Sequence, residues 1–129
     1  MKYIRLRAYI ILFTIYFVSL LLSCKEEQII LDSDIHGHWE VVAAKRNGKL
    51  TATLKDAYFT FNDEQIFSTN IYGEPKDFDF ELDSDKIMQS GDQSSEFKII
   101  SLQNDTLHLS SRMLNYNFDF LAVKSDSIL

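Results

Sequence analysis

The sequence is poor in residues that cross-link or break a chain: its 129 residues include one cysteine, one proline and four glycines. One cysteine excludes a disulfide within the chain, because a disulfide needs two. The scarcity of proline and glycine excludes long Pro-rich or Gly/Ser-rich linkers. The sequence also has no nucleophile elbow, no glycine-rich phosphate loop and no His-Glu-x-x-His motif. The composition therefore predicts one globular domain that is not an enzyme and that needs no cofactor.

The histidines offer little metal chemistry. His36 and His38 stand two positions apart, a spacing that in a strand puts both on one face and could begin a metal site. His108 lies between Leu107 and Leu109, so alternation directs it to solvent. Because no third ligand completes the pair, we expect no metal site.

The N-terminus is the most hydrophobic part of the chain. Lys2, Arg5 and Arg7 precede an uncharged run from residue 8 to residue 23. A positive segment followed by an apolar one is typical of a secretory signal peptide. The run is shorter than the roughly 20 apolar residues that a membrane-spanning helix needs. A signal peptide over residues 1–23 is therefore favoured over the alternative of an anchor helix.

The cysteine comes directly after this run, in Leu21-Leu22-Ser23-Cys24. This segment resembles the lipobox of bacterial lipoproteins, which implies cleavage before Cys24 and lipid modification of its thiol. The alternative is a lone buried thiol. Lys25-Glu26-Glu27 resembles the tether signals of some outer-membrane lipoproteins, although an ordinary solvated tether over residues 24–34 explains it as well. The resemblance implies a lipid-anchored envelope protein, on the periplasmic or the surface-exposed face of the outer membrane.

The balance of charge limits the partners. Without residues 1–23 the chain keeps ten basic and nineteen acidic residues, a formal charge of −9. Nucleic acid is excluded as a partner because phosphate backbones are bound by clustered Lys and Arg. The same balance argues against a polybasic grip on anionic lipid, so we expect the N-terminal lipid to act alone as the membrane anchor.

The rest of the chain alternates apolar and polar residues, with turn residues between the alternating segments. Asn47-Gly48 is a strong hairpin signal. Short connections favour antiparallel pairing of sequence neighbours, and eight such strands can close into an up-and-down barrel. We therefore predict an all-β fold of eight antiparallel strands, at residues 38–46, 57–61, 65–71, 77–82, 86–90, 94–101, 106–112 and 116–124.

Alternation also sorts the two faces of these strands. The side chains expected to point inward are Trp39, Val41, Ala43, Phe59, Phe61, Phe67, Phe78, Phe80, Leu82, Phe97, Ile99, Leu107, Leu109, Tyr116, Phe118 and Phe120. Those expected to point to solvent are Asp77, Asp79, Glu81, Glu96, Lys98, His108 and Asp119.

The start of the first strand points to a family. Gly37 and Trp39, in a Gly-x-Trp motif that opens an eight-stranded meander, resemble the first motif of lipocalin-like domains. The resemblance implies that Trp39 closes one end of the barrel and that a basic residue near the end of the last strand, here Lys124, packs on the indole. It covers residues 35–124 and leaves residues 125–129 as a tail.

Two functions are compatible with such a barrel. In the first, a membrane-tethered lipocalin-like protein binds a small hydrophobic ligand, and the expected pocket residues are Ala43 and Thr69 beside Phe67, Phe78 and Phe118. In the second, the many inward aromatic rings fill the interior. The domain would then be a structural or protein-interaction module of the cell envelope, meeting a protein partner through a loop such as residues 72–75 or through its acidic outer face.

Overall fold

The computed structural model describes residues 2–21 and 28–125, so Cys24 and the tail after residue 125 lie outside the described residues. Helix α1 spans Lys2–Leu21 and a short helix α2 spans Asp32–Ile35. Nine strands follow: β1 Gly37–Arg46, β2 Lys49–Leu50, β3 Tyr58–Phe61, β4 Ile66–Thr69, β5 Lys76–Asp83, β6 Lys86–Ser90, β7 Ser95–Gln103, β8 Thr106–Met113 and β9 Tyr116–Ser125. None of the described helices combines the length and the apolar character that crossing a membrane requires.

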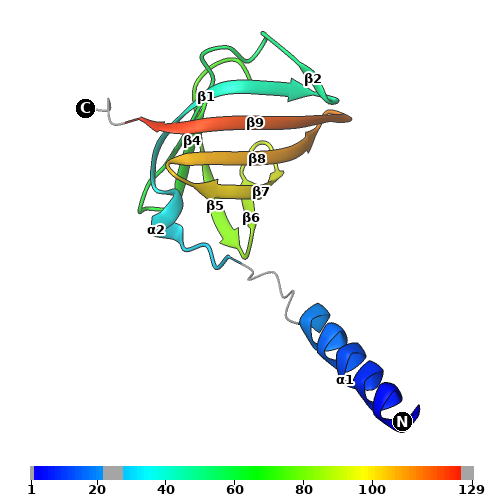
Figure 1. Ribbon diagram of the computed structural model, residues 1–129. Helices are drawn as coiled ribbons and strands as arrows, with labels where there is room; N and C mark the ends of the chain where they lie inside the picture. The colour runs from blue at the N-terminus through cyan, green and yellow to red at the C-terminus, as the bar shows by residue number, and fades with distance from the viewer. Residues whose placement is uncertain (1, 22–27, 126–129) are drawn as a thin grey trace.

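The strands form a closed antiparallel barrel (Figure 1). From β3 to β9, each strand pairs with its neighbour in sequence, and β1 pairs with both β3 and β9. The pairing of β1 with β9 closes the wall with eight strands. The two-residue β2 only extends the hairpin that turns at Asn47-Gly48. The predicted fold class is confirmed. Each predicted strand begins and ends within two residues of an observed strand.

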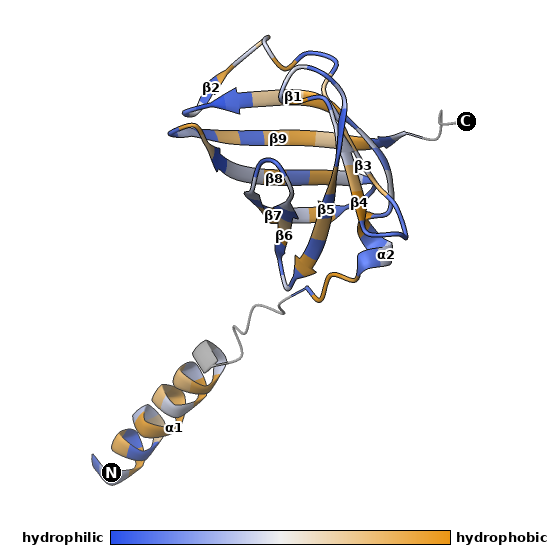
Figure 2. Ribbon diagram, turned by 180° about the vertical axis from the view of Figure 1, so that it is seen from behind, coloured by the Kyte–Doolittle hydropathy of each residue, from blue (hydrophilic) through white to orange (hydrophobic). Residues whose placement is uncertain are grey.

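Alternation along the strands separates a filled interior from a charged exterior, as the blue and orange segments of β9 illustrate (Figure 2). Fully buried side chains include Trp39 and the rings of Phe59, Phe61, Phe67, Phe80, Phe97 and Phe120. The outer face carries pairs such as Lys86 and Glu96, whose Nζ and Oε1 lie 3.2 Å apart. The hydrogen bond from Lys86 to Glu96, together with the negative charge of Glu96, raises the pKa of Lys86.

Two inward predictions are wrong. A β-bulge between Val41 and Ala43 shifts the register of β1 against β9, so that the buried side chain is Ala44, opposite Phe120. Ala43 instead pairs with the exposed Leu121 and points to the outer surface. An extra residue in a strand exchanges the two faces beyond it. Tyr116, the first residue of β9, is 43% exposed.

The barrel has its own core. The core cluster, with the partly buried side chains packed against it, lies entirely between Ile30 and Ala122. The described side chains of α1 are exposed. We therefore expect residues 28–129 to fold without the N-terminal helix.

Candidate functional site

The antiparallel order gives the barrel two distinct ends. We call the end where β1 begins and β9 ends the closed end, and the end where β1 ends and β9 begins the mouth. The hairpin turns between β1 and β2 and between β8 and β9, and the segment 70–75 between β4 and β5, all lie at the mouth.

The three residues predicted to close the barrel meet at the closed end. Trp39 is 1% exposed, and its Nε1 donates to the backbone carbonyl of Ile35, at 2.8 Å. The Nζ of Lys124 lies 5.7 Å from the centroid of the Trp39 ring. Gly37 has φ +125°, and a Cβ built on it would lie 2.9 Å from Cε of Lys124. Glycine at 37 therefore leaves the space in which the Lys124 side chain crosses to the indole.

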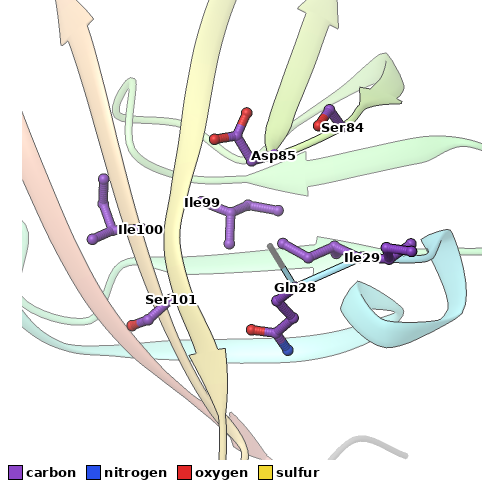
Figure 3. A pocket seen from close by; sticks show the side chains of 8 residues that line it. Gln28, Ile29, Ser84, Asp85, Ile99, Ile100 and Ser101 are labelled. Atoms are coloured by element: carbon purple, nitrogen blue, oxygen red, sulfur yellow. The ribbon is translucent and has the colours of Figure 1, made fainter. Parts of the chain in front are cut away.

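The N-terminal segment also packs at the closed end. Strand β7 continues past Lys98, the last of its residues that pairs with β6. This second half of β7 is flanked by residues 28–30 and by the turn at Ser84 and Asp85. Between them lies a groove of about 480 Å³, in which Ile99 is flanked by Gln28 and Asp85 (Figure 3). The amide of Gln28 donates to the carbonyl of Leu102 at 3.1 Å. This groove marks where the chain from the N-terminus reaches the barrel.

Aromatic rings fill the centre of the barrel. Phe67 contacts Phe61, with ring centroids 4.9 Å apart, and Phe97, at 5.7 Å. Phe59 contacts Phe120 edge-on at 5.1 Å. Spacings of this size are favourable for aromatic pairs. The middle of the barrel is therefore packed by side chains rather than open.

The mouth differs from the centre because polar groups point into it. The buried polar side chains of the described residues are Thr69, Gln89 and Ser111, and all three lie on the mouth halves of their strands. The hydroxyl of Thr69 donates to the carbonyl of Tyr58 at 2.7 Å, and that of Ser111 to the carbonyl of Glu96 at 2.7 Å.

Tyr72 reaches one of these groups, Gln89, from the segment 70–75. Its ring is half-buried and meets Phe78 edge-on, with centroids 5.6 Å apart. Its hydroxyl donates to Oε1 of Gln89 at 3.2 Å and lies 3.1 Å from Oγ of Ser95. The Gln89 amide in turn donates to the carbonyl of Gln93 at 2.9 Å. An aromatic ring with a hydroxyl group thus occupies a site that is apolar on one side and hydrogen-bonding on the other.

The structure brings four of the five predicted pocket residues to the interior. Phe67 and Phe78 are buried and face each other across β4 and β5, with centroids 6.3 Å apart. Thr69 is buried, and Phe118 is partly buried against the core. Ala43 does not join them: it lines a groove of about 280 Å³ on the outer surface, with Lys45, His108, Asp119 and Leu121.

Three site residues were not predicted as such. Gln89 and Ser111 follow the inward period of Ile87 and of Leu107 and Leu109, so alternation could have found them. The sequence placed Tyr72 only in the loop of residues 72–75. No local pattern predicts that a turn residue folds back over the barrel.

Two of the three histidines contact side chains other than histidine. His38 Nδ1 lies 2.8 Å from Oγ1 of Thr60, and His108 Nε2 lies 3.6 Å from a carboxylate oxygen of Asp119. Within the ranges 2–21 and 28–125, no three His, Cys, Asp or Glu side chains are grouped so that they could hold a metal ion.

Comparison with known proteins adds one finding. Residues 35–109, more than half of the chain, match the family model described as a lipocalin-like domain. No curated protein matches the sequence. The matched range begins just before Gly37 and Trp39 and ends within β8, at Leu109.

Proposed function

The chain belongs to the lipocalin-like domain family, and from this premise we propose that it binds a small, largely apolar molecule at the mouth of its barrel. The observation that carries the proposal is the position of Thr69, Gln89 and Ser111, the buried polar side chains of the described residues, in the mouth half. Binding sites for small molecules are mostly apolar, with a few placed polar groups that fix orientation. The mouth has this composition.

Each of these buried polar side chains is hydrogen-bonded within the domain. A buried amide or hydroxyl costs free energy unless it is hydrogen-bonded. Here Gln89 uses its amide oxygen on Tyr72, a residue of the segment 70–75 rather than of the barrel wall. A ligand hydroxyl could replace that of Tyr72 without leaving Gln89 unpaired. The ligand we expect therefore combines an apolar body with one hydroxyl group, which would donate to the Gln89 amide oxygen.

Tyr72 is placed to act as the cover of this site. It is followed by Gly73, which has φ +113° and open space around the position of a Cβ. Outward movement of the ring would break one edge-on contact with Phe78 and the hydrogen bonds to Gln89 and Ser95. The barrel wall itself would not have to change.

We further propose that the domain is tethered to a membrane by lipid on Cys24, at the outer membrane of the cell envelope, and that it binds without catalysis. Three residues separate Cys24 from Gln28, so the anchor lies within about 14 Å of Gln28 at roughly 3.5 Å per residue. Because Gln28 bonds to Leu102 at the closed end, the tether would join the barrel at its closed end.

Native mass spectrometry of residues 28–129, purified from the native host, tests ligand binding, followed by titration with an environment-sensitive fluorescent fatty acid. We expect a co-purified small molecule or saturable one-to-one binding. Tyr72→Ala should speed association, whereas Tyr58→Ala, on the outer face, should not. A bare mass together with no saturable binding by the wild-type barrel would overturn the proposal.

That negative result would favour the second function, an interaction module of the cell envelope. The observation on its side is the packing of six fully buried phenylalanine rings in the interior. Envelope proteins that co-purify with the lipidated form would then identify the partner.

A further inference from the structure

Two hairpins lie side by side at the mouth and form a joined surface. The backbone N–H of Asn47, in the β1–β2 turn, donates to the carbonyl of Asn117 at 2.7 Å. The N–H of Asn117 donates to Oδ1 of Asn47 at 2.9 Å. We call residues 45–50 and 112–117 the hairpin rim.

The hairpin rim is basic, although the chain as a whole is acidic. Its four cations, Lys45, Arg46, Lys49 and Arg112, are all exposed. No acidic residue occurs in the sequence from residue 41 to 55 or from residue 106 to 118. The nearest carboxylate along β9 is that of Asp119, which is paired with Lys45 in register and lies 3.6 Å from His108. Glu96 of β7 lines an outer groove together with Arg112, so the positive charge of the hairpin rim is least compensated at Arg46 and Lys49.

The hairpin rim is also apolar at its tips. Leu50 is 76% exposed and Leu114 is 88% exposed, one on each hairpin. Behind them the guanidinium of Arg46 lies 5.2 Å from the centroid of the Tyr116 ring. Alternating long cations and exposed apolar side chains are typical of surfaces that enter the headgroup region of a bilayer.

The backbone at Leu114 gives an independent reason to assign a role to this tip. Leu114 has φ +50° and Asn115 has φ +66°. Both are left-handed conformations, which Asn and Gly adopt readily and Leu does not. Leu114 thus combines an unfavourable backbone conformation with an exposed apolar side chain, and it gains no buried contact inside the barrel. Leu114 therefore adds little to the folding stability, and a strained, exposed residue of this kind is typical of a binding surface.

We propose that the hairpin rim docks on an anionic lipid surface, with Leu50 and Leu114 entering the headgroup region and the four cations facing lipid phosphates. Charge complementarity selects an anionic surface. The isolated leucine tips beside long cationic side chains favour lipid over protein, because such side chains can place apolar groups among lipid headgroups while their charges stay at the phosphates. The inference is independent of the proposed ligand binding.

Co-sedimentation of residues 28–129 with vesicles tests the docking in the absence of the N-terminal helix and its lipid. We expect binding to mixed phosphatidylglycerol and phosphatidylcholine vesicles, little binding to pure phosphatidylcholine, and weakening as NaCl rises. Lys49→Gln should lower the affinity roughly fivefold, the value for one lost charge near an anionic surface. Lys98→Gln removes the same charge from the outer face of β7 and should leave the affinity unchanged.

The leucine tips are tested with their own controls. Leu114→Asn and Leu50→Ser should each weaken vesicle binding, whereas Ile100→Ser, an exposed apolar residue outside the hairpin rim, should not. Since Leu114→Asn relieves the backbone conformation, its melting temperature should rise, and its loss of binding then cannot come from misfolding. Absence of binding to anionic vesicles, or equal losses in the rim and control variants, would overturn the proposal. Binding of an acidic protein through the hairpin rim without vesicle binding would also overturn it.

Discussion

Lys124 lies over the indole of Trp39, with its Nζ 5.7 Å from the ring centroid, and so joins the end of the last strand to the start of the first. The two residues are direct partners in the register of β1 and β9, the pairing that closes the barrel. A cation over an indole contributes about 0.5–1 kcal/mol at an exposed site. The contact therefore adds to a closure that depends chiefly on the strand pairing and on burial of the Trp39 ring.

Gly37→Ala should be destabilising because of this contact. The backbone conformation at Gly37, φ +125°, disfavours any L side chain by roughly 1–2 kcal/mol, and the new Cβ would lie 2.9 Å from Cε of Lys124. Urea unfolding of Gly37→Ala, Lys124→Ala and the double variant measures the two effects separately. We expect Gly37→Ala to cost less when Lys124 is already alanine; equal costs in both backgrounds would mean that the two side chains do not compete for space.

Trp39→Ala should have a larger effect, since it removes the largest buried side chain of the closed end. Truncation of a buried aromatic residue typically costs about 3–5 kcal/mol, and the carbonyl of Ile35 would lose its indole donor. Denaturant unfolding should show this loss. Val123→Ala, a half-buried apolar truncation next to Lys124 in β9, is the control and should cost much less. Similar costs in both variants would contradict the closing role of Trp39.

Much of the fold follows from period-two alternation and turn residues. Strand β5 illustrates why: Phe78 and Phe80 alternate with acidic residues, so both faces can be read from the sequence. The segment Val41-Val42-Ala43-Ala44 carries no polar residue, so nothing in it marks the bulge that turns Ala43 outward. The alternation of apolar and polar residues predicts a strand. It does not predict the bulge, because the bulge depends on how β1 pairs with β9.

The candidate site was less predictable, because it depends on contacts between distant segments. Thr69 and Phe78 could be placed from alternation within their own strands. The position of Tyr72 depends on Gln89 and Ser95, which lie 17 and 23 residues further along the chain. The hairpin rim was not predicted for a related reason. Net charge averages over the whole surface, whereas Lys49 and Arg112 belong to one surface only because β2 pairs with β1, β1 with β9 and β9 with β8.

Leu114→Asn should stabilise the barrel. Asparagine tolerates the left-handed conformation at this turn position, and relief of a leucine there amounts to about 1 kcal/mol. For a domain of this size, that corresponds to a rise of about 4–8 °C in melting temperature, measurable by calorimetry. Leu50→Asn, an exposed leucine on the neighbouring hairpin, is the control and should not raise the melting temperature. A fall in the melting temperature of Leu114→Asn would show that Leu114 supports the fold.

Cys24→Ala should abolish lipid attachment. The thiol of Cys24 is the acceptor in the proposed lipidation, and the chain has no other cysteine. Metabolic labelling with palmitate in the native host should mark the wild-type protein and leave the variant unlabelled, with its signal peptide uncleaved. Ser23→Ala keeps a small residue before the cysteine and should be labelled normally. Label that persists in Cys24→Ala would contradict the proposed anchor.

Tyr72→Phe should separate the two contributions that Tyr72 makes at the mouth. The variant keeps the edge-on contact with Phe78 but loses the hydroxyl that pairs with Gln89 and Ser95. Loss of such a hydrogen bond costs about 0.5–1.5 kcal/mol, so urea unfolding should show a modest destabilisation. If a ligand hydroxyl replaces that of Tyr72, the variant should bind the ligand more tightly than the wild type, because no hydrogen bond has to be broken first. Tyr58→Phe, on the outer face, should change neither quantity, and weaker ligand binding by Tyr72→Phe would mean that the Tyr72 hydroxyl contacts the ligand instead of being displaced by it.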